Sequence, residues 1–157
     1  MEMKKPRYFL WILAVEAVGF LSGILSREGT DRYAPMANKP PLSPPGWVFP
    51  IVWTVLYLLM GEASWRVLTS GAESDKIRKA LIAYGVQLGL NFLWSIVFFA
   101  LGWYLAAFFV LIALWIMILL TIRAFTPIDE TAGDLLIPYI LWVTFAGYLN
   151  LGVYFLN

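Results

Sequence analysis

The chain has 157 residues, of which 61% are hydrophobic, 17% aromatic and only 13% charged. Soluble domains carry roughly a quarter charged residues, so this composition excludes an ordinary water-soluble domain and also a disordered chain. The chain has no cysteine and no histidine, which excludes disulfides, zinc sites, Ser-His-Asp triads and haem held by either residue, so no metal site is expected. The net charge of +1 excludes the basic surface that a nucleic-acid partner needs.

Stretches without charged residues predict five membrane-spanning helices. These stretches cover residues 40–61, 80–122 and 135–157, and a helix needs about 20 apolar residues to cross a bilayer. The longest stretch has room for two helices, with a turn at Gly102-Trp103 between them. Together with the apolar N-terminal stretch, the predicted spans cover residues 8–26, 48–68, 80–101, 104–125 and 135–155 of a single domain, residues 1–157. The sequence therefore predicts an all-α, polytopic membrane protein, a five-transmembrane-helix bundle in the lipid bilayer.

The distribution of lysine and arginine predicts the orientation of the bundle. If the N-terminus is cytoplasmic, most of these residues lie on the cytoplasmic side, and only Arg27, Arg32 and Lys39 lie outside. Because cytoplasmic loops are enriched in positive charge, we expect a cytoplasmic N-terminus and an external C-terminus.

The first predicted span contains Glu16 near its middle. A carboxyl group inside a membrane must be protonated, be paired or face a cavity. A protonated side chain hydrogen-bonded to a neighbouring helix is the simpler interpretation, and a role in proton transfer or ligand binding is the alternative. Both remain open at this point.

The connection between the first two spans, residues 29–47, is long and rich in proline. It contains Pro35, Pro40, Pro41, Pro44 and Pro45, and proline cannot continue a helix because it lacks an N–H group. Loops of this length in compact proteins are usually functional or disordered, and their stiffness here favours an ordered, functional segment. We therefore predict a lid, called the lid loop below.

Three of the predicted spans carry a face on which aromatic rings, amides and small residues share one side of the helix. Residues four positions apart lie on the same face. The faces comprise Trp53, Tyr57 and Gly61 on the second span, Gln87, Asn91 and Ser95 on the third, and Trp142, Ala146 and Asn150 on the fifth. For any single residue, contact between helices is the simpler interpretation. As a set, these residues favour a concave site for a flat, apolar ligand.

The third span also carries Gly85 and Gly89, a pair of small residues that allows two helices to approach closely. At 100° per residue, this pair lies about 160° from the face that bears Gln87 and Asn91. The third span is therefore predicted to form a homodimer contact on one side and to line the bundle interior on the other.

Three blocks of sequence resemble a known family. Residues 39–61 read KPPLSPPGWVFPIVWTVLYLLMG, residues 87–95 read QLGLNFLWS, and residues 138–143 read PYILWV. This pattern resembles the TspO/MBR family, also known as the tryptophan-rich sensory protein or translocator protein family and as the peripheral-type benzodiazepine receptor. The resemblance covers essentially the whole chain and is to bacterial members.

The resemblance implies a five-helix bundle, usually a homodimer, with a pocket under the lid loop. Family ligands are porphyrins (protoporphyrin IX and haem), sterols, and isoquinoline or benzodiazepine-type drugs. By position, the ligand-lining residues are Trp53, Tyr57, Asn91, Ser95, Trp142 and Ala146, and the lid residues are Tyr33, Pro44 and Pro45. Gln87 and Asn150 lie on the same two faces and are added as ligand-binding candidates. Trp53 and Trp142 match the pair implicated in light-dependent breakdown of protoporphyrin in some bacterial members.

The sequence departs from the family pattern at two places. In the lid loop, Arg32-Tyr33 stands where relatives often have Trp-Tyr, and Leu42 stands where they often have tryptophan, so the lid contacts of the family are expected less here. The sterol-recognition pattern needs a basic residue after Tyr154, and none follows. Sterol binding is therefore expected less than porphyrin binding.

Three functions follow as hypotheses. The first is a tetrapyrrole-binding protein of a bacterial cell membrane that senses, transports or turns over porphyrin and requires no cofactor. The second is an enzyme that degrades protoporphyrin IX in light, with Trp53 and Trp142 as its catalytic residues. The third is a small solute transporter, for which Glu16 is one of the few expected signs.

Overall fold

The structure, a computed structural model, describes residues 4–25 and 39–157, and these residues form helices and connecting turns without any strand. The helices are α1 (Lys4–Leu25), α3 (Val48–Leu68), α4 (Ser74–Ser95) with its π-helical turn η1 (Ile96–Ala100), α5 (Tyr104–Phe125), α6 (Glu130–Leu135) and α7 (Ile137–Leu156). Five of the resulting segments are long and apolar enough to cross a membrane. The predicted all-α fold with five spans is therefore confirmed.

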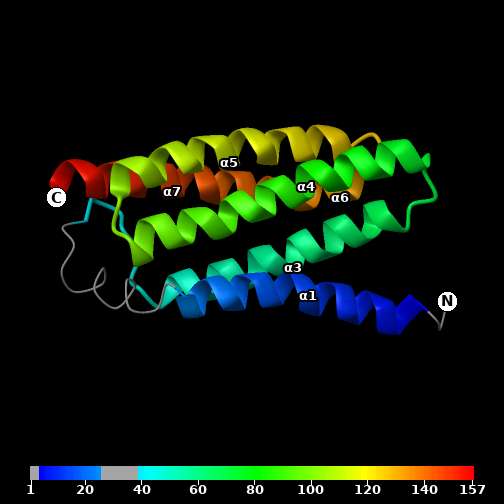
Figure 1. Cartoon of the computed structure of the whole chain (residues 1–157), viewed down its shortest axis with the longest axis horizontal. Helices are drawn as coiled ribbons and strands as arrows, with labels where there is room; N and C mark the ends of the chain where they lie inside the picture. Colours follow the sequence, from blue (N-terminus) through cyan, green and yellow to red (C-terminus); the bar gives the residue numbers. More distant parts are fainter. Residues whose placement is uncertain (1–3, 26–38) are drawn as a thin grey trace.

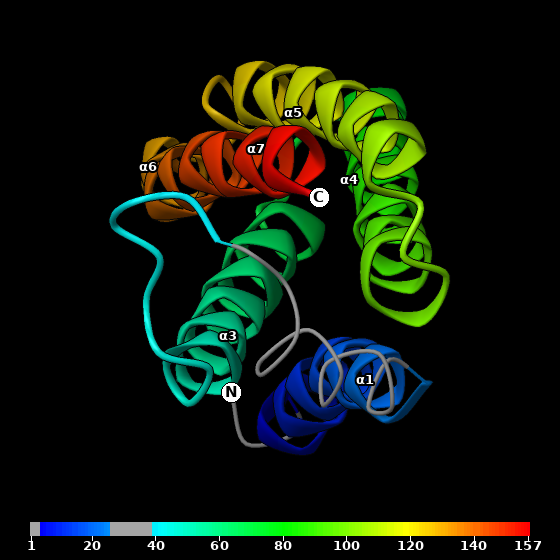
Figure 2. The ribbon, with the colours of Figure 1, turned by 90° about the vertical axis from the view of Figure 1, so that its left-hand side faces the viewer.

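The helices run back and forth along one axis, so the two ends of the chain lie at opposite ends of the bundle (Figure 1). Seen end-on, α7 lies next to α5, and α3 lies between α7 and α1 (Figure 2). Most of the core comes from α3, α4, α5 and α7, with Leu114 and Ile118 of α5 fully buried. Helix α1 packs mainly along α3 and leaves much of its own apolar surface exposed.

Two helices begin and end at the predicted residues, whereas a third extends further. Helices α3 and α5 match the predicted spans, and α5 follows a turn in which Gly102 has a φ of 66°. Helix α4 begins at Ser74 rather than at residue 80. Its first turns carry charged residues, among them Asp75 and Lys79, whose side chains form an ion pair at 3.1 Å. A charge-free stretch marks the part of a helix that lies in hydrocarbon, and the helix itself continues into the polar region.

The fifth span is interrupted near its start. Helix α6 ends before Leu136, and α7 begins at Ile137 with Pro138 in its first turn. Proline has no N–H group for the preceding turn, which accounts for the break. The side chain of Asp129 caps α6 by accepting a hydrogen bond from the Ala132 N–H at 3.0 Å.

Arg66 links the end of α3 to the start of α6. Its Nε lies 3.2 Å from the Asp129 carboxylate, whereas its Nη1 lies 3.9 Å from Glu62. Arg66 therefore pairs with both carboxylates, and Asp129 is the closer partner. Burial alone would raise the pKa of Asp129, but the Ala132 N–H and the Arg66 guanidinium outweigh burial and hold that pKa below its ordinary value.

Glycine allows α1 and α3 to pack closely. A Cβ atom on Gly19 of α1 would lie 2.6 Å from the Tyr57 ring of α3, and one on Gly61 of α3 would lie 2.7 Å from Ile12 of α1. Gly61 therefore serves helix packing rather than a concave site. The Trp11 indole also donates a hydrogen bond to Ser64 at 2.8 Å. These contacts set the distance between the two helices.

We expect Gly19→Ala to destabilise the protein by about 1–3 kcal/mol, because the added methyl group meets a ring that is held in place by a hydrogen bond. Thermal unfolding in detergent measures the effect. Gly23→Ala is the matched control on the same helix, since a Cβ there meets nothing within 4 Å. Equal unfolding midpoints for the two variants would contradict the close packing of α1 on Tyr57.

Candidate functional site

Among the described residues, a large cavity lies between α1, α3 and the end of α4. Its volume is about 400 Å³, and its walls are mainly apolar. It is lined by Glu16, Gly19, Phe20, Ser22, Gly23, Ile24, Phe49, Pro50, Trp53, Thr54, Tyr57, Asn91, Ser95 and Phe99. We call it the main cavity. Aromatic side chains with a few polar groups are typical of sites for small hydrophobic ligands.

Several polar side chains of the main cavity already have protein partners. The Tyr57 hydroxyl donates to Asn91 Oδ1 at 2.8 Å, and the Thr54 hydroxyl donates to the Pro50 carbonyl at 2.7 Å. The Ser95 hydroxyl donates to the Asn91 carbonyl at 3.4 Å. These bonds fix the orientation of the groups and make the wall less polar than its composition indicates.

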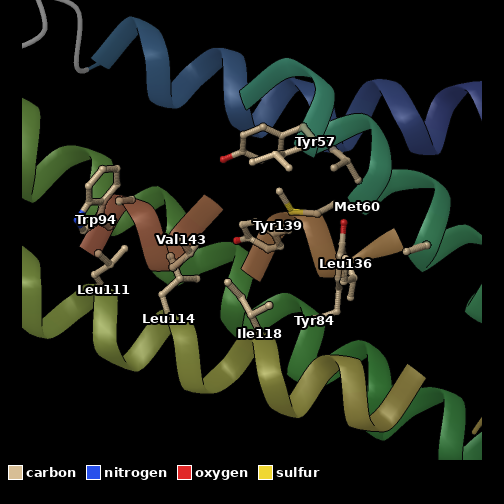
Figure 3. Close-up of a cluster of buried hydrophobic side chains, with 14 of the residues drawn as sticks. Tyr57, Met60, Tyr84, Trp94, Leu111, Leu114, Ile118, Leu136, Tyr139 and Val143 are labelled. Atoms are coloured by element: carbon tan, nitrogen blue, oxygen red, sulfur yellow. The ribbon is translucent and has the colours of Figure 1, made fainter. Parts of the chain in front are cut away.

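Behind the main cavity, a buried hydrogen-bond network joins three helices. Asn91 Nδ2 donates to the Tyr139 hydroxyl at 2.7 Å, and this hydroxyl donates to Gln87 Oε1 at 2.6 Å. Gln87 Nε2 lies 3.9 Å from the sulfur of Met60. Figure 3 shows Tyr57 and Met60 of α3 on one side of Tyr139 of α7. The network positions Asn91 and Tyr57 at the cavity wall.

A second, much smaller cavity of about 10 Å³ lies next to the main cavity. Phe49, Trp53 and Phe99 line both cavities, whereas Trp142 and Ala146 line only the smaller one. The Phe49 and Trp142 rings meet edge to face at 6.0 Å. Aromatic side chains therefore separate the main cavity from Trp142.

Asn150, on the wall of the smaller cavity, connects α7 to α4 and to the start of α5. Its Oδ1 accepts a hydrogen bond from the Trp94 indole at 2.9 Å, and its Nδ2 donates to the Tyr104 carbonyl at 2.7 Å. Both ends of the amide are thus used within the protein. By contrast, Trp142 Nε1 is buried without a hydrogen-bond partner among the described residues.

The end of the lid loop is attached to α7. Pro40 packs directly on Gly152, since a Cβ atom on Gly152 would lie only 2.5 Å from the Pro40 ring. The Tyr148 hydroxyl donates a hydrogen bond to the Pro41 carbonyl at 2.6 Å. Leu42 follows with a φ of 72°, an uncommon value for a residue other than glycine. The residues from Lys39 to Trp47 contain no helix, as their prolines predict.

A family model described as the TspO/MBR family matches residues 11–156. The chain belongs to the TspO/MBR family. A "Tryptophan-rich protein TspO" of Chlorobaculum tepidum is 38% identical over 141 residues, which are 90% of this chain and 89% of the relative. A "Tryptophan-rich sensory protein" of Cereibacter sphaeroides is 38% identical over 95% of this chain and 90% of its own. A bovine "Translocator protein" is 34% identical over 84% of this chain and 79% of its own.

The structure divides the site residues expected from the TspO/MBR resemblance into separate groups. Trp53, Tyr57, Asn91 and Ser95 line the main cavity, and Trp142, Ala146 and Asn150 line the smaller one together with Trp53. Gln87 lies behind the wall, in the buried network. Pro44 and Pro45 line neither of these two cavities, and Tyr33 lies outside the described residues.

Sequence reasoning missed several residues that line the main cavity. Phe49 and Pro50 lie inside the TspO/MBR sequence block, but their side of the helix could not be read from the pattern alone. On α1, Phe20 and Gly23 lie four and seven positions after Glu16. This spacing defines one helical face. The position of Glu16 in the sequence could therefore have predicted which side of α1 faces the cavity.

We expect Tyr139→Phe to destabilise the TspO/MBR fold by about 1–3 kcal/mol, because it leaves Asn91 Nδ2 and Gln87 Oε1 buried without their partner. Tyr154→Phe on the same helix, where the ring stacks on Phe155, is the control. Thermal unfolding of both variants in detergent measures the difference. A Tyr139 variant as stable as the control would mean that the network contributes nothing to stability.

Proposed function

We propose that this TspO/MBR family protein binds porphyrin or haem, and other small flat hydrophobic ligands such as isoquinoline-type drugs, in the main cavity. The observation that carries the proposal is a cavity of about 400 Å³ with aromatic walls whose polar groups are held in fixed orientations. Flat ring systems stack favourably on such walls. Sensing, transport or turnover of the ligand is the proposed physiological role, which agrees with the words "sensory" and "translocator" in the relatives' names.

The lining favours metal-free porphyrin at least as much as haem. Histidine and cysteine are absent from the chain, and none of the described residues that line the main cavity is a methionine. The Tyr57 hydroxyl, another candidate axial ligand, donates to Asn91. A neutral ring system stacked on Trp53 therefore fits this wall as well as an iron complex does.

We further propose a homodimer through α4. Gly85 and Gly89 are exposed, and a Cβ on either residue would meet nothing within 4 Å. Gln87 and Asn91 lie on the buried side of the same helix. This division supports a contact between two copies at the glycine face.

The proposed location is a bacterial cell membrane, with the N-terminus in the cytoplasm. The five apolar segments make the protein an integral membrane protein. The start of α1 and the end of α7 lie at opposite ends of the bundle (Figure 1), which supports termini on opposite sides of the membrane. The lysine and arginine distribution supports a cytoplasmic N-terminus.

Titration with protoporphyrin IX, followed by its absorption shift, tests the binding site. We expect the Trp53→Phe/Trp142→Phe double variant to bind at least about tenfold more weakly than the wild type, because two stacking surfaces are reduced. Trp103→Phe is the control, since Trp103 is exposed in the turn before α5. Unchanged affinity in the double variant would overturn the site assignment.

The single variants show which cavity is used. Trp53 lines both cavities, whereas Trp142 lines the smaller one. If porphyrin stays in the main cavity, Trp53→Phe alone accounts for most of the loss. A large loss for Trp142→Phe shows that the two cavities join when the ligand binds.

Light-dependent degradation of the porphyrin is the second candidate function. The shared position of Trp53 and Trp142 on the smaller cavity favours it, because both rings are oxidisable and Trp53 also lines the main cavity, where the ligand is proposed to bind. Illumination of the same complexes separates the two functions. A bilin-like product formed by the wild type supports an enzyme, and bleaching at the rate of free porphyrin supports a binding protein.

We expect replacement of both Pro44 and Pro45 by glycine to weaken porphyrin affinity by roughly 4- to 30-fold, mainly through faster release, because the more flexible lid loop loses more entropy on closing. Stopped-flow dissociation measures the release rate, and circular dichroism checks the helices. Pro127→Gly, in the turn between α5 and α6, is the control. An unchanged release rate with intact helices would mean that the loop is a connector.

A further inference from the structure

Among the described residues that line the main cavity, Glu16 is the acidic one. It lies near the middle of α1, and Phe20, Gly23 and Ile24 of the same helix line the cavity with it. Its Oε1 atom is buried and has no hydrogen-bond partner among the described residues. A carboxyl oxygen without a partner is costly in a membrane-spanning helix, so a ligand that supplies a hydrogen-bond donor to Oε1 would be favoured at this position.

Four hydrogen-bond donors of the cavity wall are used elsewhere. The hydroxyl groups of Thr54, Tyr57 and Ser95 donate to α3 or α4, and Asn91 Nδ2 donates to Tyr139. Ser22 lies six residues further along α1 than Glu16, which is about 9 Å along the helix axis. The hydrogen bonds donated by Thr54, Tyr57, Ser95 and Asn91 thus do not involve the buried oxygen of Glu16.

We propose that Glu16 recognises a nitrogen-bound hydrogen of the ligand, and that the main cavity therefore selects flat aromatic ligands with a protonated or N–H-bearing nitrogen. This inference rests on the proposed function, because it takes the main cavity as the ligand site. A hydrogen bond between an ionised carboxylate and a charged nitrogen is about twice as strong as a neutral one. Glu16 thus acts as a specificity determinant within an otherwise aromatic site.

The same group restricts the orientation of an acidic ligand. When Glu16 is ionised, a carboxylate of the ligand placed against it would bring two like charges together in an apolar cavity. A porphyrin with carboxylate substituents is therefore bound with its carboxylates away from Glu16 and with a face of the ring, from which its central N–H groups can be reached, towards α1. This assigns α1 a role in recognition, beyond its packing on α3.

Two probes of similar shape test the inference, 9-aminoacridine and acridine. At neutral pH the first is a cation with N–H donors, and the second is uncharged. In nanodiscs of uncharged lipid, we expect the wild type to bind 9-aminoacridine at least about tenfold more tightly than acridine. Fluorescence titration measures both affinities.

Substitution of Glu16 should remove this preference. Glu16→Gln and Glu16→Leu should bind the two probes about equally, and measurable acridine binding by these variants shows that the cavity is intact. Glu62→Gln is the matched control, since Glu62 lies on α3 outside the lining of the main cavity and accepts a hydrogen bond from Tyr8. This control should keep the preference.

Three results would overturn the inference: equal affinities of the wild type for the probes, a preference retained in both Glu16 variants, or binding of neither probe. A protoporphyrin IX titration of the same samples separates this outcome from failure of the proposed function. Porphyrin binding without a Glu16-dependent preference rejects the inference alone. A Glu16-dependent preference without porphyrin binding supports the inference and rejects the porphyrin function.

Discussion

The need to pair polar groups away from water governs this bundle, and only a few buried side-chain atoms of the described residues, among them Trp142 Nε1, remain unpaired. In a membrane, an amide or hydroxyl group without a partner is costly, and the chain meets this constraint with the linked side chains of Tyr57, Asn91, Tyr139 and Gln87. These side chains come from α3, α4 and α7, so the network fixes the relative positions of three helices. The main cavity lies beside this network, because Tyr57 and Asn91 belong to the network and also line the cavity.

The sequence predicted the number of spans, the bounds of α3 and α5, and the inward faces of α3, α4 and α7. Charge-free stretches and the Gly102 turn carry that information directly. The early start of α4 was not predicted, because charged residues can belong to a helix outside the hydrocarbon. The functions of Gln87 and Asn150 could not be separated from those of Asn91, because a pattern gives the face of a residue and not its partner.

The predicted site emerges as a main cavity and a separate small one, and the reason is local. Phe49 and Phe99 lie on the walls of both, and the Phe49 ring packs against Trp142. A helical face tells which residues point inwards, but the size of the intervening rings decides whether two inward-facing residues share a space. Trp53 and Trp142 share only the smaller one. The contribution of α1 was visible in advance only as an isolated carboxyl group.

The contact between Pro40 and Gly152 couples two distant parts of the sequence. Because the proline ring occupies the space that a side chain at position 152 would need, these positions should change together during evolution. A relative with a larger residue at the position of Gly152 must have a smaller residue, or a displaced backbone, at that of Pro40. Covariation between these positions would thus show, from sequences alone, that Pro40 at the end of the lid loop packs against α7.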